Sequence, residues 1–121
     1  MDIAPTFIEA ANGKYPDDGS VEPMQGISLT PLLLGETGSI HPDDEVFVMF
    51  HRNQAFVRQG KWKLTNIERP FDEKNFTLHN IETDPGETTD LSGTNPEKRQ
   101  ELLEIWRTER KELGIVLPLD L

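Results

Sequence analysis

Few residues of this 121-residue chain could do chemistry, and their types restrict what that chemistry is. There is no cysteine, which excludes a thiol nucleophile and thiolate metal ligands. Carboxylates could bind a hard cation such as calcium, and two aspartate pairs occur, Asp17-Asp18 and Asp43-Asp44. The first pair lies in a stretch rich in glycine and proline, and the second precedes an apolar run. We interpret both as polar turns.

A third acidic group consists of Asp84, Glu87 and Asp90. Its spacing lacks the fixed glycine and the terminal glutamate of a helix-loop-helix calcium site. Asp84-Pro85-Gly86 is a turn signal. We therefore expect no metal ligand in this chain.

The three histidines differ in their sequence context. His51 and Asn53 follow one apolar run and precede another, and loop residues beside a rigid sheet often carry function. We take His51 and Asn53 as candidate substrate-binding residues, the alternative being an ordinary turn with solvated polar tips. His41, next to a proline, is expected to be exposed in a loop. His79 is expected to be structural, because no second ligand lies at metal-ligand spacing. No residue is assigned a catalytic role.

A series of predicted strands places the candidate turn. Residues 45–51 form a short apolar run rich in valine and phenylalanine, which predicts a strand buried on both faces. Runs at 54–58 and 61–67 flank Gln59-Gly60, where the glycine can supply the positive φ of a tight hairpin. Residues 76–81 predict a fourth strand. Because short links join these strands, they should form an antiparallel sheet.

A long helix should follow the sheet. Asn95-Pro96-Glu97 is a helix start, with a cap, a proline in the first position and an acid in the first turn. Gly114 should end the helix. Between them, an apolar stripe recurs on one helical face: Leu102, Leu103, Trp106 and Leu113. The expected fold class is α+β, a four-stranded antiparallel sheet packed against one long C-terminal helix, with a short N-terminal helix and irregular loops.

The chain before the sheet has a different texture. Asp2 is expected to cap a helix of about two turns that carries Phe7 and Ile8. Residues 14–31 predict an irregular connection, because they are rich in glycine, proline, aspartate and serine. An apolar burst at 29–34 predicts one helical turn. We therefore divide the chain into residues 1–44, a helix with an irregular connection, and residues 45–121, the sheet with its helix.

The charge balance disfavours some partners. The formal net charge is −10, so binding to nucleic acid or to an anionic membrane surface is not expected. No run of about 18 apolar residues predicts a transmembrane helix, and the first residues lack the pattern of a signal peptide. A local basic patch is the exception to the acidic balance: Arg52, Arg58, Lys61 and Lys63.

Several stretches, in this order along the chain, resemble arylsulfatases. Residues 2–11, Asp-Ile-Ala-Pro-Thr-Phe-Ile-Glu-Ala-Ala, resemble the D-I-x-P-T helix of that family, and Tyr15-Pro16 and residues 26–33 follow as they do there. Residues 55–64 resemble its A-h-R-x-G-x-W-K-L hairpin, in which h is apolar. Residues 78–91 resemble its strand and turn L-Y-(D/N)-L-x-x-D-P-x-E-x-x-D-L. Together they resemble the C-terminal subdomain of a formylglycine-dependent sulfatase.

The resemblance implies a sulfuric ester hydrolase as the parent protein. Residues 1–44 would be the tail of its catalytic domain and residues 45–121 its C-terminal subdomain. Such enzymes use a formylglycine, made from Cys or Ser in a C/S-x-P-x-R motif, and a divalent cation, usually calcium. No serine here is followed by x-Pro-x-Arg; the serines are Ser20, Ser28, Ser39 and Ser92. The resemblance thus implies a chain that is not catalytic alone but supports the parent and lines part of its substrate cleft.

The implied partners are the missing N-terminal catalytic domain and, through the parent, a sulfated small molecule or glycan. Cut free, the first helix and Leu32-Leu33-Leu34 should expose apolar surface, so the chain should self-associate or leave residues 1 to about 40 poorly ordered against the sheet. Two other functions stay open: a free-standing non-catalytic binding or subunit-interaction protein, and the C-terminal part of a related phosphate or phosphonate ester hydrolase. The compartment also stays open, with a periplasmic or secreted parent as one alternative.

Overall fold

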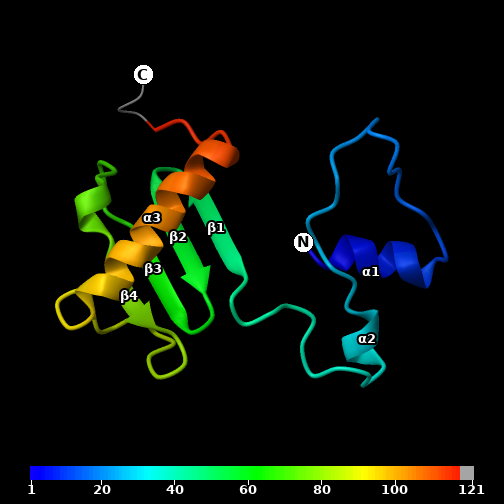
Figure 1. Ribbon diagram of the computed structural model, residues 1–121, viewed down its shortest axis with the longest axis horizontal. Helices are drawn as coiled ribbons and strands as arrows, with labels where there is room; N and C mark the ends of the chain where they lie inside the picture. The colour runs from blue at the N-terminus through cyan, green and yellow to red at the C-terminus, as the bar shows by residue number, and fades with distance from the viewer. Residues whose placement is uncertain (118–121) are drawn as a thin grey trace. The chain divides into compact units, whose positions relative to one another are not determined.

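The chain divides into two compact units, Met1–Pro42 and Asp43–Leu121 (Figure 1). The structure is a computed structural model that describes residues 1–117. No helix within that range is long and apolar enough to cross a membrane.

The first unit joins two short helices, α1 (Ile3–Ala10) and α2 (Thr30–Leu33), by a long irregular connection. Thr6 links them, because its hydroxyl donates to the Asp2 carbonyl at 2.6 Å and accepts from the Leu29 N–H at 2.8 Å. Thr6 is the buried residue of α1, and a buried hydroxyl needs such partners. It therefore anchors the start of α2 to α1.

Asp2 and His41 differ from what the sequence predicts. Asp2 makes no capping hydrogen bond to α1. One of its carboxylate oxygens instead accepts from the Ile27 N–H at 3.0 Å, and the other lies 2.7 Å from His41 Nε2. The hydrogen bond with His41, followed by that from Ile27, lowers the pKa of Asp2. The expectation of a merely exposed His41 is wrong, because its ring ties the end of this unit to its beginning.

The second unit is built on a four-stranded antiparallel sheet in the order β1-β2-β3-β4. The strands are β1 (Val46–His51), β2 (Gln54–Gln59), β3 (Trp62–Asn66) and β4 (Thr77–Asn80). Gly60 turns the β2–β3 hairpin with φ +57°, where an added Cβ would lie 2.8 Å from the Asp43 carbonyl oxygen. The predicted sheet and its antiparallel pairing are confirmed.

Strand β1 lies at the edge of the sheet, and the prediction that it is buried on both faces is wrong, because none of its residues is fully buried. Val46, Val48 and Phe50 pack against the core, whereas Met49 is 55% exposed. Successive side chains of a strand point to opposite faces. The unbroken apolar run therefore belongs to a strand with one covered face and one open face.

Helix α3 (Pro96–Glu112) covers one face of the sheet (Figure 1). Leu102, Leu103 and Trp106 are buried, as the stripe predicts. The Trp106 ring lies against three phenylalanine rings at centroid distances of 5.6 to 6.2 Å: Phe50, Phe71 and Phe76. The stripe is wrong at Leu113, which is 48% exposed. The helix has ended there, since Gly114 takes φ +64°.

The outer side of β4 is closed by the segment that leads to α3. The Leu78 N–H donates to the Asp90 carboxylate at 3.0 Å, and the Leu78 carbonyl accepts from the Leu91 N–H at 2.7 Å. His79 is buried, with Nδ1 2.9 Å from the Thr89 carbonyl and Nε2 2.9 Å from the Thr77 hydroxyl. Both ring nitrogens thus serve the fold. The α+β class predicted from the sequence is confirmed.

Candidate functional site

Two connections lie at one end of the sheet, which we call the loop end. In an antiparallel meander every second link lies at the same end. The β1–β2 turn at 52–53 and the β3–β4 connection at 67–76 therefore share this end (Figure 1). Gln54 joins them, because its side-chain N–H donates to the Ile67 carbonyl at 3.3 Å. His51 and Asn53, the predicted substrate-binding residues, lie here.

The β1–β2 turn has an unusual backbone. His51 pairs with Gln54, which leaves Arg52 and Asn53 at the two central positions with φ of +50° and +63°. Positive φ at both positions is the pattern of a type I′ turn, which favours asparagine and glycine. Asn53 suits this pattern, whereas left-handed backbone costs most other residues roughly 1 to 2 kcal/mol. Arg52 therefore occupies its position against a local backbone preference.

The polar side chains of this turn make no hydrogen bond or ion pair with residues 1–117. His51 and Arg52 are exposed and Asn53 is half-buried. All three can donate to a polar ligand, and His51 and Asn53 can also accept. Residues 51–54 and 67–76 contain no serine, threonine, tyrosine or cysteine, so these two connections suit binding rather than nucleophilic attack.

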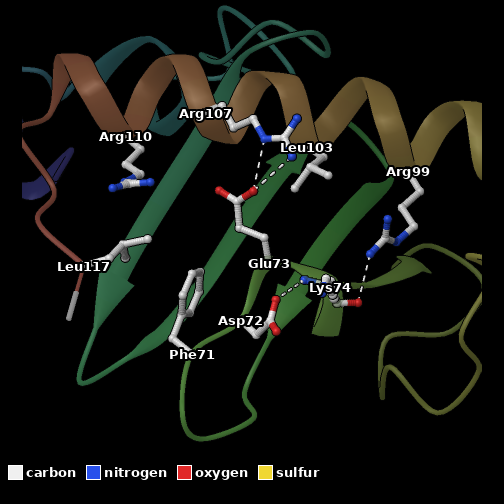
Figure 2. Close-up of a pocket in the computed structure, with 9 residues that line it drawn as sticks. All are labelled: Phe71, Asp72, Glu73, Lys74, Arg99, Leu103, Arg107, Arg110 and Leu117. Carbon is white, nitrogen blue, oxygen red and sulfur yellow. Dashed lines mark hydrogen bonds and ion pairs between the residues drawn. The ribbon is translucent and has the colours of Figure 1, made fainter. Parts of the chain in front are cut away.

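A cleft of about 690 Å³ opens between α3 and the β3–β4 connection (Figure 2). Its lining combines apolar, acidic and basic side chains: Phe71, Leu103, Leu117, Asp72, Glu73, Lys74, Arg99, Arg107 and Arg110. The arginines are already used by the fold. Arg107 donates to Glu73 at 3.1 Å and to Glu104 at 2.9 Å, and the bond to Glu73 raises the pKa of Arg107.

Arg99 and Arg107 hold the β3–β4 connection against α3. Arg99 donates to the carbonyl oxygens of Phe76 and Lys74, each at 3.1 Å. Figure 2 shows both guanidinium groups directed from α3 at the short 3-10 helix η1 (Glu73–Asn75) and its neighbours. The residues that line the cleft therefore fix the β3–β4 connection, and with it the loop end, against α3.

The sheet face opposite α3 carries another hollow, of about 490 Å³, lined in part by Phe56, Arg58, Lys63 and Glu87. Lys63 pairs with Glu87, and its ammonium lies 5.1 Å from the Phe56 ring centre. Arg58 donates to the Gly60 carbonyl at 3.2 Å. Arg58 and Lys63 sit beside the β2–β3 hairpin, at the end of the sheet opposite the loop end. The residues that form one basic patch in the sequence therefore lie at two ends of the sheet, with Arg52 at the loop end and Arg58 and Lys63 at the other end.

The acidic loop after β4 does not fit a cation. Asp84 accepts from the Thr88 hydroxyl and from the Thr89 N–H, each at 2.9 Å. Glu87 pairs with Lys63, and Asp90 accepts from the Ser92 N–H at 2.9 Å. Three ligating side chains gather nowhere in residues 1–117. The calcium that the resemblance implies for the parent finds no ligand set in this loop.

Arg69 is the residue of the loop end that sequence reasoning missed. It lies in the exposed tip Glu68-Arg69-Pro70 of the β3–β4 connection. The strand pattern could have found it. Once 45–51, 54–58, 61–67 and 76–81 are strands of one meander, the links at 52–53 and 68–75 must share an end.

No family model matches the chain. Solved structures are similar to it, and these structural neighbours are sulfatases. Ps i-CgsB in complex with k-i-k-neocarrahexaose is 21% identical with a TM-score of 0.61, over 88% of this chain and 23% of that chain. A structure from work on glycosaminoglycan metabolism by Bacteroides thetaiotaomicron is 19% identical with a TM-score of 0.61, over 91% of this chain and 24% of that one.

A third structure, solved in complex with its substrate D-glucosamine-2-N,6-O-disulfate, is 22% identical with a TM-score of 0.63, over 91% of this chain and 23% of that one. The chain thus spans about a quarter of the length of these proteins. At such identities the likeness concerns the fold. The chain has the fold of a segment of sulfatases, in agreement with the resemblance of its sequence to their C-terminal subdomain.

Proposed function

We propose that this chain is the C-terminal subdomain of a sulfatase, that it supports the fold of the parent, and that His51 and Asn53 line the substrate cleft. The shared fold over 88 to 91% of the chain carries this proposal. The ordered motifs from Asp2 to Leu91 support it independently, because they belong to the amino-acid sequence and not to the fold.

The chemistry of bond cleavage belongs to the parent in this proposal. The missing domain would supply the formylglycine and the cation that the resemblance implies for cleavage of the sulfate ester. This chain supplies binding groups on a rigid support. A turn between two paired strands places donors and acceptors more accurately than a free loop does.

The substrate class that we propose is a sulfated sugar. One neighbour was solved with its substrate D-glucosamine-2-N,6-O-disulfate, and another with k-i-k-neocarrahexaose. His51 and Asn53 suit such a ligand, because hydroxyl and sulfate groups need hydrogen-bond donors and hydroxyl groups also need acceptors.

Two assays of the purified chain test the proposal. With an aryl sulfate and calcium, we expect no turnover above the buffer blank. In an NMR titration with D-glucosamine-2-N,6-O-disulfate, we expect the backbone amide signals of residues 51–54 to shift most. Turnover that follows the chain through purification would contradict the non-catalytic role.

Variants sharpen the titration. His51→Ala and Asn53→Gly should each weaken binding about two- to tenfold, as the loss of one or two hydrogen bonds implies. Glycine at position 53 keeps the positive φ, so the turn survives. Gln100→Ala, an exposed neutral residue on α3, is the control and should change nothing. Equal binding by all variants would exclude His51 and Asn53 as substrate contacts.

A further inference from the structure

We infer that Arg52 and Arg69 form an anion subsite at the loop end, which binds a second negatively charged group, sulfate or carboxylate, of the sulfated sugar that His51 and Asn53 contact. The inference rests on the proposed function. It adds to that function that the substrate carries a second negatively charged group.

The tip that carries Arg69 is held at its base from three sides. Gln54 binds the Ile67 carbonyl from β2 at 3.3 Å, and the Asn66 amide donates to the Asp72 carbonyl at 2.7 Å. Arg107 binds Glu73 from α3 at 3.1 Å. Phe71 is 5% exposed.

Between these anchors, Glu68, Arg69 and Pro70 are exposed. A short exposed tip on a fixed base presents its side chain at little cost in conformational entropy.

Arg69 makes no ion pair within residues 1–117. The carboxylate of Asp72 accepts from the Lys74 N–H at 2.9 Å, and that of Glu73 is bound by Arg107 at 3.1 Å. Glu68 makes no ion pair in the described chain. Asp72 and Glu73 are therefore bound by other groups of the fold, and Glu68 does not pair with Arg69. All N–H donors of the Arg69 guanidinium remain available for a ligand.

Arg52 gives the second observation, which is independent of the first. Its φ of +50° is one that glycine or asparagine adopts more readily. The fold does not use the charge of an arginine there, since its side chain makes no hydrogen bond or ion pair in residues 1–117. A residue held in a disfavoured conformation without a structural reason points to function.

The chemistry of the pair selects the ligand. Guanidinium groups bind sulfate and carboxylate through two parallel N–H donors. Arg52 and Arg69 stand at one end of a chain with a formal net charge of −10. Most charged residues of the chain are acidic and disfavour anions, so a pair of arginines without ion pairs is the feature of the loop end that attracts them. A sugar with two anionic groups should therefore bind better than a sugar with one.

The test is an NMR titration of the full chain with three probes: D-glucosamine-2-N,6-O-disulfate, N-acetyl-D-glucosamine 6-sulfate, and a monosulfated disaccharide that carries a uronic acid. The third probe distinguishes a carboxylate from a second sulfate. We expect the disulfate to bind roughly two- to fivefold tighter than the monosulfate for each guanidinium engaged, the range of exposed ion pairs. This preference should fall as salt is added.

Arg52→Gly and Arg69→Ala should each reduce the preference for two charges. Arg58→Ala removes the same charge at the opposite end of the sheet and should leave it unchanged. Arg52→Gly should also raise the urea midpoint, because glycine takes the positive φ freely. A folded Arg52→Gly chain with weaker disulfate binding therefore separates the subsite from stability.

The outcomes separate the two claims. Equal affinity for one and two charges, with unaltered binding by both arginine variants, would overturn the subsite even if the signals of residues 51–54 shift. Absence of any shift at 51–54 with every probe would overturn the proposed cleft role as well. An effect of Arg58→Ala equal to that of Arg69→Ala would show only general charge attraction, and would also overturn the subsite.

Discussion

Replacing Leu102 by alanine should destabilise the second unit severely, whereas replacing Leu113 by alanine should not. The sequence pattern puts both leucines on one apolar stripe. In the structure Leu102 is fully buried on the face of α3 that packs against the core, and Leu113 is 48% exposed just past the end of the helix. The pair thus tests the packing of α3 with an identical chemical change.

The magnitude follows from burial. A buried leucine cut to alanine loses its transfer free energy and leaves a cavity, which together cost about 2 to 5 kcal/mol. A unit of about 80 residues has a free energy of unfolding of roughly 4 to 12 kcal/mol. Leu102→Ala should remove about half of it. Leu113→Ala should cost less than about 1 kcal/mol, as exposed substitutions do.

Urea unfolding followed by circular dichroism and by the fluorescence of the buried Trp106 measures both variants. The midpoint should fall strongly for Leu102→Ala, with an unchanged m value if two-state behaviour holds. A Leu102→Ala loss below about 1 kcal/mol, or a Leu113→Ala loss in the range of a core leucine, would refute the described packing of α3.

Acid should weaken the second unit through Asp90. Burial is the largest effect on the Asp90 pKa and raises it, but hydrogen bonds from Ser92 and from the Leu78 N–H outweigh burial and lower the pKa below 3.8. Such a group stabilises the fold above its unfolded pKa, and the contribution is lost as pH falls through the folded pKa. Asp90→Asn should therefore lower the urea midpoint at about pH 6 and have little effect at about pH 2, whereas an equal effect at both would contradict this. The isolated chain should also self-associate in sedimentation velocity, since Phe7, Leu33 and Leu34 are 70%, 72% and 68% exposed. Phe7→Glu with Leu33→Glu should give a monomer, and a strictly monomeric wild-type chain would contradict the expectation.

The strands and α3 could be predicted because local signals coincide there with the final packing. Gly60 and Gly114 mark a hairpin and a helix end, and both have positive φ in the structure. The predictions that failed concern features that depend on long-range packing. Nothing local says that Met49 lies on an open face, or that Asp2 turns from the helix to meet His41 39 residues away.

The loop end was predictable only in part. His51 and Asn53 stand next to a strand in the sequence, so their place in a turn could be predicted. The position of Arg69 at the loop end depends on the order of the strands and on hydrogen bonds from Gln54 and Arg107, which belong to other elements. The positive φ of Arg52 follows from the pairing of His51 with Gln54, because that register leaves two residues for the turn.

The coding sequence upstream of the Met1 codon tests the central claim most directly, since a sulfatase subdomain needs the domain that holds the nucleophile and the cation. Sequencing the native gene and its transcript should reveal a continuous reading frame that encodes a large α/β domain with a C/S-x-P-x-R motif. An in-frame stop codon directly before Met1, with translation starting there, would contradict the claim and favour a free-standing binding protein.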